Sequence, residues 1–145
     1  MASNLERAQT FFNKLSKENL AIVDDFYDPN VVFQDPVHKL VGVTAIKKYY
    51  QHQYESVDSI RFEYIKLFEK ENEVSLSWRM YLKSPSLQSG QEITVDGASF
   101  FTFDEQSKKV IFQRDYFDMG EFVYERVPLL KSLIHFIKNK LAGST

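Results

Sequence analysis

Two aspartates stand at positions where the chain would hold a carboxylate for proton transfer. Asp35 ends a short β-rich run and precedes Pro36. In an apolar pocket it would be a general base, whereas in an ordinary Asp-Pro turn it would only cap a loop. Asp115 lies in a later β-rich run. Asp118, three residues further, would face the other side of a straight strand and is better placed to end it.

Arg79 and Tyr81 share one face of a predicted strand, opposite Trp78 and Met80. If that face lines a cavity, Arg79 can reach Asp115 and hold the carboxylate ionised and oriented. If the face is solvated, Arg79 forms an ordinary cross-strand ion pair that contributes little. The pattern of residues leaves both interpretations open.

The remaining ionisable residues favour structural roles. His38, His52 and His135 form no cluster with ligand spacing, so no metal site is predicted. His38 fits a loop residue or a proton relay at a pocket mouth. Asp96 precedes Gly97 and fits a bend in its strand.

Composition excludes several classes of protein. The 145 residues, 43% of them hydrophobic, predict one domain over residues 1–145. The lack of cysteine excludes disulfides and thiolate chemistry, and fits a cytoplasmic protein. A net charge of −2 gives no basic footprint for nucleic acid, and no apolar run approaches the roughly 20 residues of a membrane span. The N-terminal residues lack the pattern of a signal peptide. Aromatic residues reach 15%, which predicts a dense core or an aromatic-walled cavity.

Hydrophobic periodicity predicts the elements that position these residues. Helical spacing marks residues 4–15, 19–26 and 45–54, with a short strand at 31–34 between the last two. Alternating polarity marks strands at 60–64, 74–82, 93–103 and 110–117, with a bulge or bend at Gly97. Helices followed by a meander predict an α+β fold with antiparallel pairing, in which a curved sheet wraps around the N-terminal helices and leaves one apolar pocket. An apolar helix at about 127–141 is expected to pack on its own domain or on a partner rather than on a membrane.

Two motifs resemble those of known enzymes. Residues 31–37, with Asp35-Pro36-Val37, and the following Gly42–Tyr50 segment resemble part of the ketosteroid isomerases, in which an aspartate before proline is the general base. Arg114–Asp118 resembles the last-strand motif of limonene epoxide hydrolases, whose first aspartate takes part in activating water. With the order of elements, the chain resembles the SnoaL-like branch of the nuclear transport factor 2-like superfamily over nearly its whole length. The resemblance implies a cystatin-like cone, a homodimer through the outer face of the sheet, and a small-molecule enzyme without a cofactor.

The chain departs from both enzymes at matched positions. Phe11 and Ser99 stand where the isomerases have a tyrosine and a protonated acid, so the main oxyanion donors are replaced. The Arg-x-Asp of the hydrolases becomes Arg79-Met80-Tyr81, in which a possible proton donor, Tyr81, replaces the second carboxylate.

The resemblance favours catalysis by Asp115 oriented by Arg79, with Asp35 as the second acid or base and Tyr81 as a donor. The expected substrate is compact and apolar, and the reaction is that of an isomerase, a cyclase or an epoxide-hydrolase-like enzyme. The alternative is a non-catalytic module that binds an apolar ligand or a protein partner. The residues expected to line the pocket are Phe11, Phe12, Phe33, Tyr49, Tyr50, Tyr81, Ser99 and Phe117. Trp78, Phe101 and Phe112 are expected on the outer face of the sheet, near the dimer contact.

Overall fold

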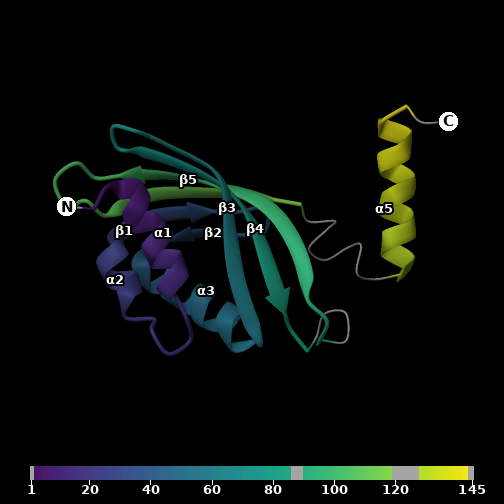
Figure 1. The fold of residues 1–145 in the computed structure, drawn as a ribbon, viewed down its shortest axis with the longest axis horizontal. Coiled ribbons are helices and arrows are strands. Elements are labelled where there is room, and N and C mark those ends of the chain that lie inside the picture. The colour runs from purple at the N-terminus through teal and green to yellow at the C-terminus, as the bar shows by residue number, and fades with distance from the viewer. Residues whose placement is uncertain (1, 86–89, 119–127, 144–145) are drawn as a thin grey trace.

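The computed structural model describes residues 2–85, 90–118 and 128–143 of the chain. Its helices are α1 (Asn4–Lys14), α2 (Ile22–Phe26), α3 (Val43–Glu55) and α5 (Pro128–Leu141). Its strands are β1 (Tyr27–Gln34), β2 (Lys39–Val41), β3 (Ser59–Lys70), β4 (Glu73–Lys83), β5 (Ile93–Phe103) and β6 (Val110–Phe117). The long strands form a curved sheet, with α1, α2 and α3 gathered on its concave side (Figure 1). The predicted α+β class and curved-sheet architecture are confirmed.

The sheet has the strand order β2-β1-β6-β5-β4-β3, and one of its pairs differs from the prediction. β3, β4, β5 and β6 pair antiparallel, as expected of a meander. β1, however, pairs parallel with β6. A parallel pair needs a long crossover, and the segment from β2 through β5 supplies it. β1 is also longer than predicted, because the Asp28-Pro29-Asn30 turn signal falls inside the strand, where the pairing with β6 shifts register.

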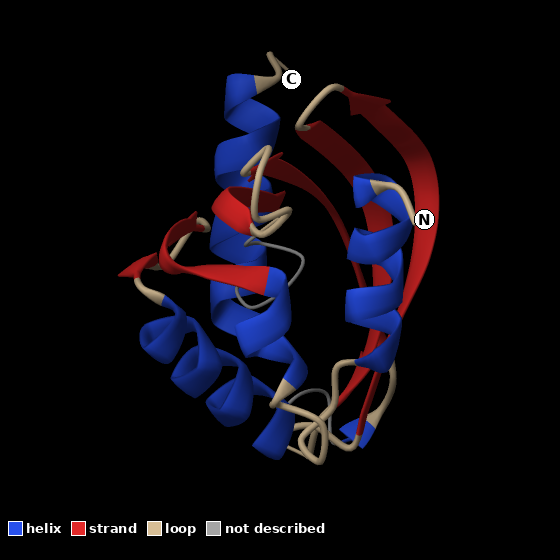
Figure 2. Cartoon of the chain, turned by 90° about the vertical axis from the view of Figure 1, so that its left-hand side faces the viewer, coloured by secondary structure: helices blue, strands red, loops and turns tan. Residues whose placement is uncertain are grey.

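Local signals explain where the helices begin. Ser3 caps α1: its Oγ accepts from the Glu6 amide at 3.1 Å, and the Glu6 carboxylate accepts from the Ser3 amide at 3.4 Å. Gly42 precedes α3 with a φ of 94°, a conformation that favours glycine. The second helix is shorter than predicted and begins at Ile22. Figure 2 shows α1 lying along the concave side of the curved strands.

The closed end of the cone is filled with aromatic rings, and this corrects three predictions. Phe11 stacks on Phe26 with ring centroids 4.2 Å apart and meets Tyr27 edge-on. Phe11, Phe33 and Phe101 are all buried in this core. Phe11 and Phe33 therefore belong to the core and not to a pocket wall, and Phe101 faces inward rather than outward. Phe11 and Phe101 pack on the rings of α1 and α2, and Phe33 packs on Tyr49 of α3. Phe112 is exposed, as predicted.

Gly97 makes room for an indole instead of forming a bulge. The pairing of β4 with β5 is regular from Ile93 to Thr102 and sets Gly97 opposite Trp78. A Cβ atom at Gly97 would overlap the Trp78 ring and come within 2.7 Å of the Tyr116 carbonyl oxygen. Trp78 therefore lies across the inner face of the sheet, and its predicted outward position is wrong, because the apolar residues of β4 all turn inward.

α5 lies apart from the cone in Figure 1. Its apolar side chains Leu133, Phe136 and Ile137 are exposed, and Lys138 pairs with Asp118 at 3.7 Å. The start of the helix predicted at about 127 lies outside the described residues. No helix in the described part of the chain is long and apolar enough to cross a membrane.

Candidate active site

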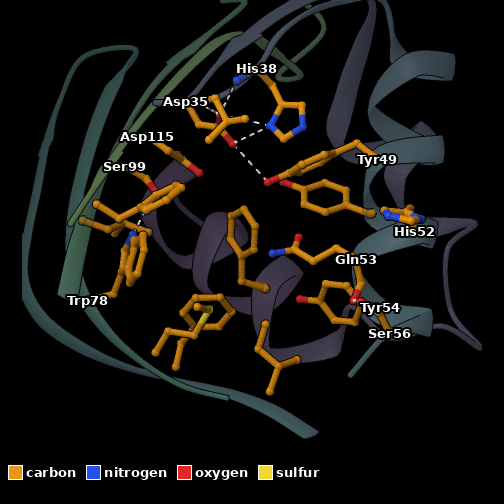
Figure 3. A pocket seen from close by; sticks show the side chains of 18 of the residues that line it. Asp35, His38, Tyr49, His52, Gln53, Tyr54, Ser56, Trp78, Ser99 and Asp115 are labelled. Carbon is orange, nitrogen blue, oxygen red and sulfur yellow. Dashed lines mark hydrogen bonds and ion pairs between the residues drawn. The ribbon is translucent and has the colours of Figure 1, made fainter. Parts of the chain in front are cut away.

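A cavity of about 300 Å³ lies between the concave face of the sheet and α3. Aromatic rings make much of its wall (Figure 3). They include Phe12, Tyr49, Tyr50, Phe62, Trp78 and Phe117. Such a wall suits a compact apolar ligand, because burial of apolar surface stabilises its binding.

The two predicted aspartates both face this cavity. β1 and β6 run parallel with Gln34 beside Arg114; Asp35 directly follows the end of β1, and Asp115 is the next residue of β6. Neighbouring strands lie about 4.8 Å apart, so the register sets these two acids side by side. Arg114 Nη1 also donates to the Asp35 carbonyl oxygen at 3.4 Å. Figure 3 shows both acids at the same end of the cavity.

The Asp115 carboxyl combines burial with two hydrogen-bond donors. Its Oδ1 accepts from Gln113 Nε2 at 2.9 Å. Ser99 lies directly opposite Asp115 in the pairing of β5 with β6, and its hydroxyl, as a donor, lowers the pKa of the carboxyl. Burial raises the pKa of Asp115 from 3.8 to about 6, and the nearby charge of Asp35 adds to the rise. The bonds from Gln113 and Ser99 and the charge of Arg114 oppose it. A carboxyl with this pKa can both accept and release a proton near neutral pH.

The Asp35 carboxylate is held by its own turn and by α3. Oδ1 accepts from the amides of Val37 at 2.8 Å and His38 at 2.6 Å, and the His38 ring lies 3.2 Å away. Oδ2 accepts from the Tyr49 hydroxyl at 3.1 Å. Burial and then the charge of Asp35 raise the pKa of Tyr49 far above its ordinary value, so this hydroxyl remains a donor. Asp35 thus forms the Asp-Pro turn and also lines the cavity.

Arg79 and Tyr81 lie on the opposite side of the sheet from the cavity. Arg79 Nε donates to Asp96 Oδ1 at 2.8 Å, and both side chains are exposed. The Tyr81 hydroxyl donates to Glu63 Oε1 at 3.4 Å. The Arg61 guanidinium stacks over the Tyr81 ring, 3.8 Å from the ring centroid. The predicted pairing of Arg79 with Asp115 and the place of Tyr81 in the cavity are therefore wrong. Side chains alternate along a strand, so Arg79 and Tyr81 face outward because Trp78 and Met80 face inward.

Comparison with known proteins places the chain in a family. The family model of the SnoaL-like domain matches residues 8–110. The chain belongs to the SnoaL-like family. A search of curated protein sequences gives no significant match.

Solved structures share the fold of this SnoaL-like protein at low sequence identity. A protein of Shewanella denitrificans OS-217 assigned as a SnoaL-like polyketide cyclase is 21% identical with a TM-score of 0.73, over 82% of this chain and 93% of its own. An LEH-like epoxide hydrolase of M. tuberculosis is 16% identical with a TM-score of 0.69, over 90% and 94%. A protein of Agrobacterium tumefaciens assigned as an isomerase of the SnoaL-like family is 20% identical with a TM-score of 0.63, over 81% and 99%.

The other residues predicted for the pocket lie in its wall, and one important neighbour was missed. Tyr49, Tyr50, Ser99 and Phe117 line the cavity of the SnoaL-like protein, together with His38 and His52. The missed residue is Gln113, which is fully buried and bonds Asp115. Its position two residues before Asp115 on one strand was the available signal, since such residues share a face. Among the described residues, no three His, Asp or Glu side chains form a group that would hold a metal ion.

Proposed function

We propose that this SnoaL-like protein is an acid–base enzyme that moves a proton on a compact apolar small molecule, with Asp115 as the catalytic residue and no cofactor. The observation that carries the proposal is the Asp115 carboxyl, which faces an aromatic-walled cavity of about 300 Å³ with its pKa raised to about 6. A carboxyl of ordinary pKa is a weak base at neutral pH, whereas one raised by burial removes protons more effectively.

Proton transfer at carbon is the reaction that the geometry favours. The Asp115 carboxylate would take a proton from the carbon beside a carbonyl. In an isomerisation it would return the proton to another carbon of the substrate. In an aldol cyclisation the enolate carbon would attack a second carbonyl carbon of the same molecule, and the proton would go to the alkoxide oxygen that this forms. The version of epoxide hydrolysis expected from the sequence needs Arg79 and Tyr81, and both lie outside the cavity. The names of two structural neighbours, a polyketide cyclase and an isomerase, are consistent with this choice.

Asp35 serves as the second acid or base in this proposal. Its Oδ1 is occupied by the two amides of the turn, whereas Oδ2 accepts mainly from Tyr49. His38 Nδ1 lies 3.3 Å from Oδ2, so a substrate hydrogen would take the place of this ring at the second lone pair. The negative charge of Asp35 also contributes to the raised pKa of Asp115.

Hydrogen exchange tests the proposal and does not require the product to be identified. A panel of enolisable cyclic ketones and polyketide-like diketones is incubated in D₂O, and deuterium uptake is followed by mass spectrometry. We expect Asp115→Asn to slow enzyme-dependent exchange by about 10² to 10⁴-fold, the usual contribution of a general base. Asp96→Asn is the matched control, because Asp96 lies on the outer face. Equal exchange by wild type and Asp115→Asn would remove Asp115 from the mechanism.

A non-catalytic module that binds an apolar ligand is the second candidate. The donors around the acids are already engaged: Tyr49 with Asp35, Ser99 and Gln113 with Asp115. An enolate oxygen formed at this end would therefore need a donor from elsewhere in the wall. Native mass spectrometry of the purified protein distinguishes the two functions, since a binding module would retain its ligand unchanged.

The outer face of the sheet supports the homodimer that the resemblance implies. Phe100 and Tyr116 form an edge-on pair with centroids 5.9 Å apart, and both are exposed, as is Phe112. We propose that a second copy covers these rings, and light scattering of wild type and of Phe112→Glu tests it. A cytoplasmic location is proposed as well, supported by the lack of cysteine.

A further inference from the structure

Buried polar side chains form a first hydrogen-bonded chain that ends on Asp115. The hydroxyls of Tyr50 and Tyr27 lie 2.8 Å apart. Tyr27 donates to Gln113 Oε1 at 2.6 Å, and Gln113 Nε2 donates to Asp115 Oδ1 at 2.9 Å. Tyr27 and Gln113 are completely buried, so this chain crosses the core behind the cavity wall.

A second chain reaches the same carboxyl from β4 and β5. Trp78 Nε1 donates to Ser99 Oγ at 2.9 Å. Ser99 is the residue directly opposite Asp115 in the pairing of β5 with β6, and its hydroxyl lowers the pKa of the Asp115 carboxyl as a donor would. The space above Gly97 lets the indole lie close enough to donate to Ser99. Figure 3 shows Trp78, Ser99 and Asp115 in sequence along one side of the cavity.

The direction of each hydrogen bond follows from what its partners can do. An indole N–H only donates, so Ser99 accepts from Trp78 and its own hydrogen is left for Asp115. Gln113 Oε1 accepts from Tyr27, which fixes the amide with its NH₂ group toward Asp115. Because the hydrogen of Tyr27 goes to Gln113, the bond between the tyrosines takes its hydrogen from Tyr50. Every donor in both chains therefore points toward Asp115.

We propose that Gln113, Tyr27, Ser99 and Trp78 are positioning residues, which hold the Asp115 carboxyl in one orientation and stabilise its anion through two converging chains of directed hydrogen bonds. The inference deepens the proposed function, because it concerns the same carboxyl. It also explains why the strand next to the cavity buries a glutamine, although buried amides are costly unless both ends are satisfied.

The two chains act together with the charge of Arg114 and against burial and the charge of Asp35 in setting the pKa of Asp115. Burial and the charge of Asp35 favour its protonated form, whereas the charge of Arg114 favours its anion. Tyr27, Tyr49 and Tyr50 are uncharged at neutral pH, because burial raises the pKa of each far above its ordinary value. Gln113 and Ser99 are thus the donors that a substitution can remove, and removing either one raises the pKa of Asp115.

NMR titration of the Asp115 carboxyl tests this inference without a substrate. Protein labelled with ¹³C at aspartate carboxyls is titrated, and Asp115→Asn assigns the resonance. We expect Gln113→Leu and Ser99→Ala each to raise the midpoint by about one to two pH units, the value of one hydrogen bond to a charged group. Tyr27→Phe frees the amide of Gln113 to turn and raises the midpoint by less. Tyr54→Phe, a buried tyrosine of the wall outside both chains, leaves the midpoint unchanged.

A double variant controls for loss of folding. Gln113→Leu alone leaves the Tyr27 hydroxyl without its acceptor, whereas Tyr27→Phe with Gln113→Leu replaces both partners by apolar groups of similar shape. The double variant must show the same rise as Gln113→Leu. The inference would be overturned if the titration midpoint of Asp115 stayed within about 0.3 pH units of wild type in both Gln113→Leu and the double variant, even if ketone exchange is lost. A raised midpoint in a protein that exchanges no ketone supports the chains and contradicts only the proposed function.

Discussion

Replacing Asp115 by asparagine is expected to stabilise the protein at neutral pH while removing the proposed general base. The pKa of Asp115 rises from 3.8 to about 6 on folding, so the folded state binds this proton more tightly than the unfolded state does. As pH rises from below 3.8 to above 6, the carboxyl ionises more readily in the unfolded state than in the folded state, and the free energy of unfolding therefore falls. Asparagine keeps the oxygen that accepts from Gln113 and carries no charge to bury.

The size of the effect follows from the shift in pKa. A shift of roughly two units corresponds to about 3 kcal/mol at 1.36 kcal/mol per unit. Asp115 borders the cavity, where water screens its charge, so about 3 kcal/mol is the upper value. For a chain of this size it corresponds to a rise in Tm of about 6 to 12 °C.

Urea unfolding of both proteins between pH 4 and pH 8 measures the difference. We expect the two unfolding free energies to lie close together at pH 4 and to separate as pH rises, with Asp115→Asn the more stable at pH 8. A gap that stays constant with pH would show that the Asp115 carboxyl does not titrate abnormally. A wild type that is the more stable at pH 8 would refute the reasoning outright. Asp96→Asn provides a surface control, since its carboxyl pairs with Arg79 in solvent.

Other predictions concern rate, packing and specificity. If Asp115 is the base, kcat/KM for an exchanged ketone rises with pH through about 6 and then levels off, whereas a general acid would give the opposite slope. Gly97→Ala forces the Trp78 ring aside and lowers Tm and exchange together, and unchanged indole fluorescence would contradict this. Arg79→Ala leaves Tm and exchange nearly unchanged, because its ion pair with Asp96 is exposed; a loss of exchange would return Arg79 to the site. Since the described cavity wall holds two carboxylates and no lysine or arginine, a ligand bearing a carboxylate should bind at least tenfold more weakly than its neutral amide by calorimetry, and equal affinities would contradict it.

Periodicity predicted most of the elements, because each rests on neighbouring residues. The alternation along β4 is clear in the sequence, but alternation alone does not say which face turns inward. Both faces carry large side chains, with Trp78 and Met80 on one and Arg79 and Tyr81 on the other. The choice is decided by burial of the more apolar set, and the resemblance to an enzyme with a catalytic arginine on this strand led to the opposite choice.

Contacts between segments that are distant in the sequence could not be predicted from local residue patterns. The Asp35-Pro36 pair gave a local signal for one acid, but the parallel pairing that sets it beside Asp115 joins distant segments. Gln113 is a comparable case: its spacing from Asp115 indicates only that the two share a face of the strand, whereas its role follows from its hydrogen bonds with Tyr27 and Asp115. The core positions of Phe11 and Phe33 likewise depend on long-range helix packing, because Phe11 stacks on Phe26 of α2 and Phe33 packs on Tyr49 of α3.

The parallel pairing of β1 with β6 separates the chemistry of this site from its selectivity. The spacing of the two acids is set by backbone hydrogen bonds between two strands, and not by the side chains of α3, β3 and β4 that shape the opposite wall. Replacing Phe62, Tyr54 or Met80 by a smaller residue would therefore enlarge the cavity while the two acids keep their separation. A scaffold of this kind can change the size of ligand that it admits while its two acids stay in place, which makes the wall residues the natural starting point for redesign toward larger ligands.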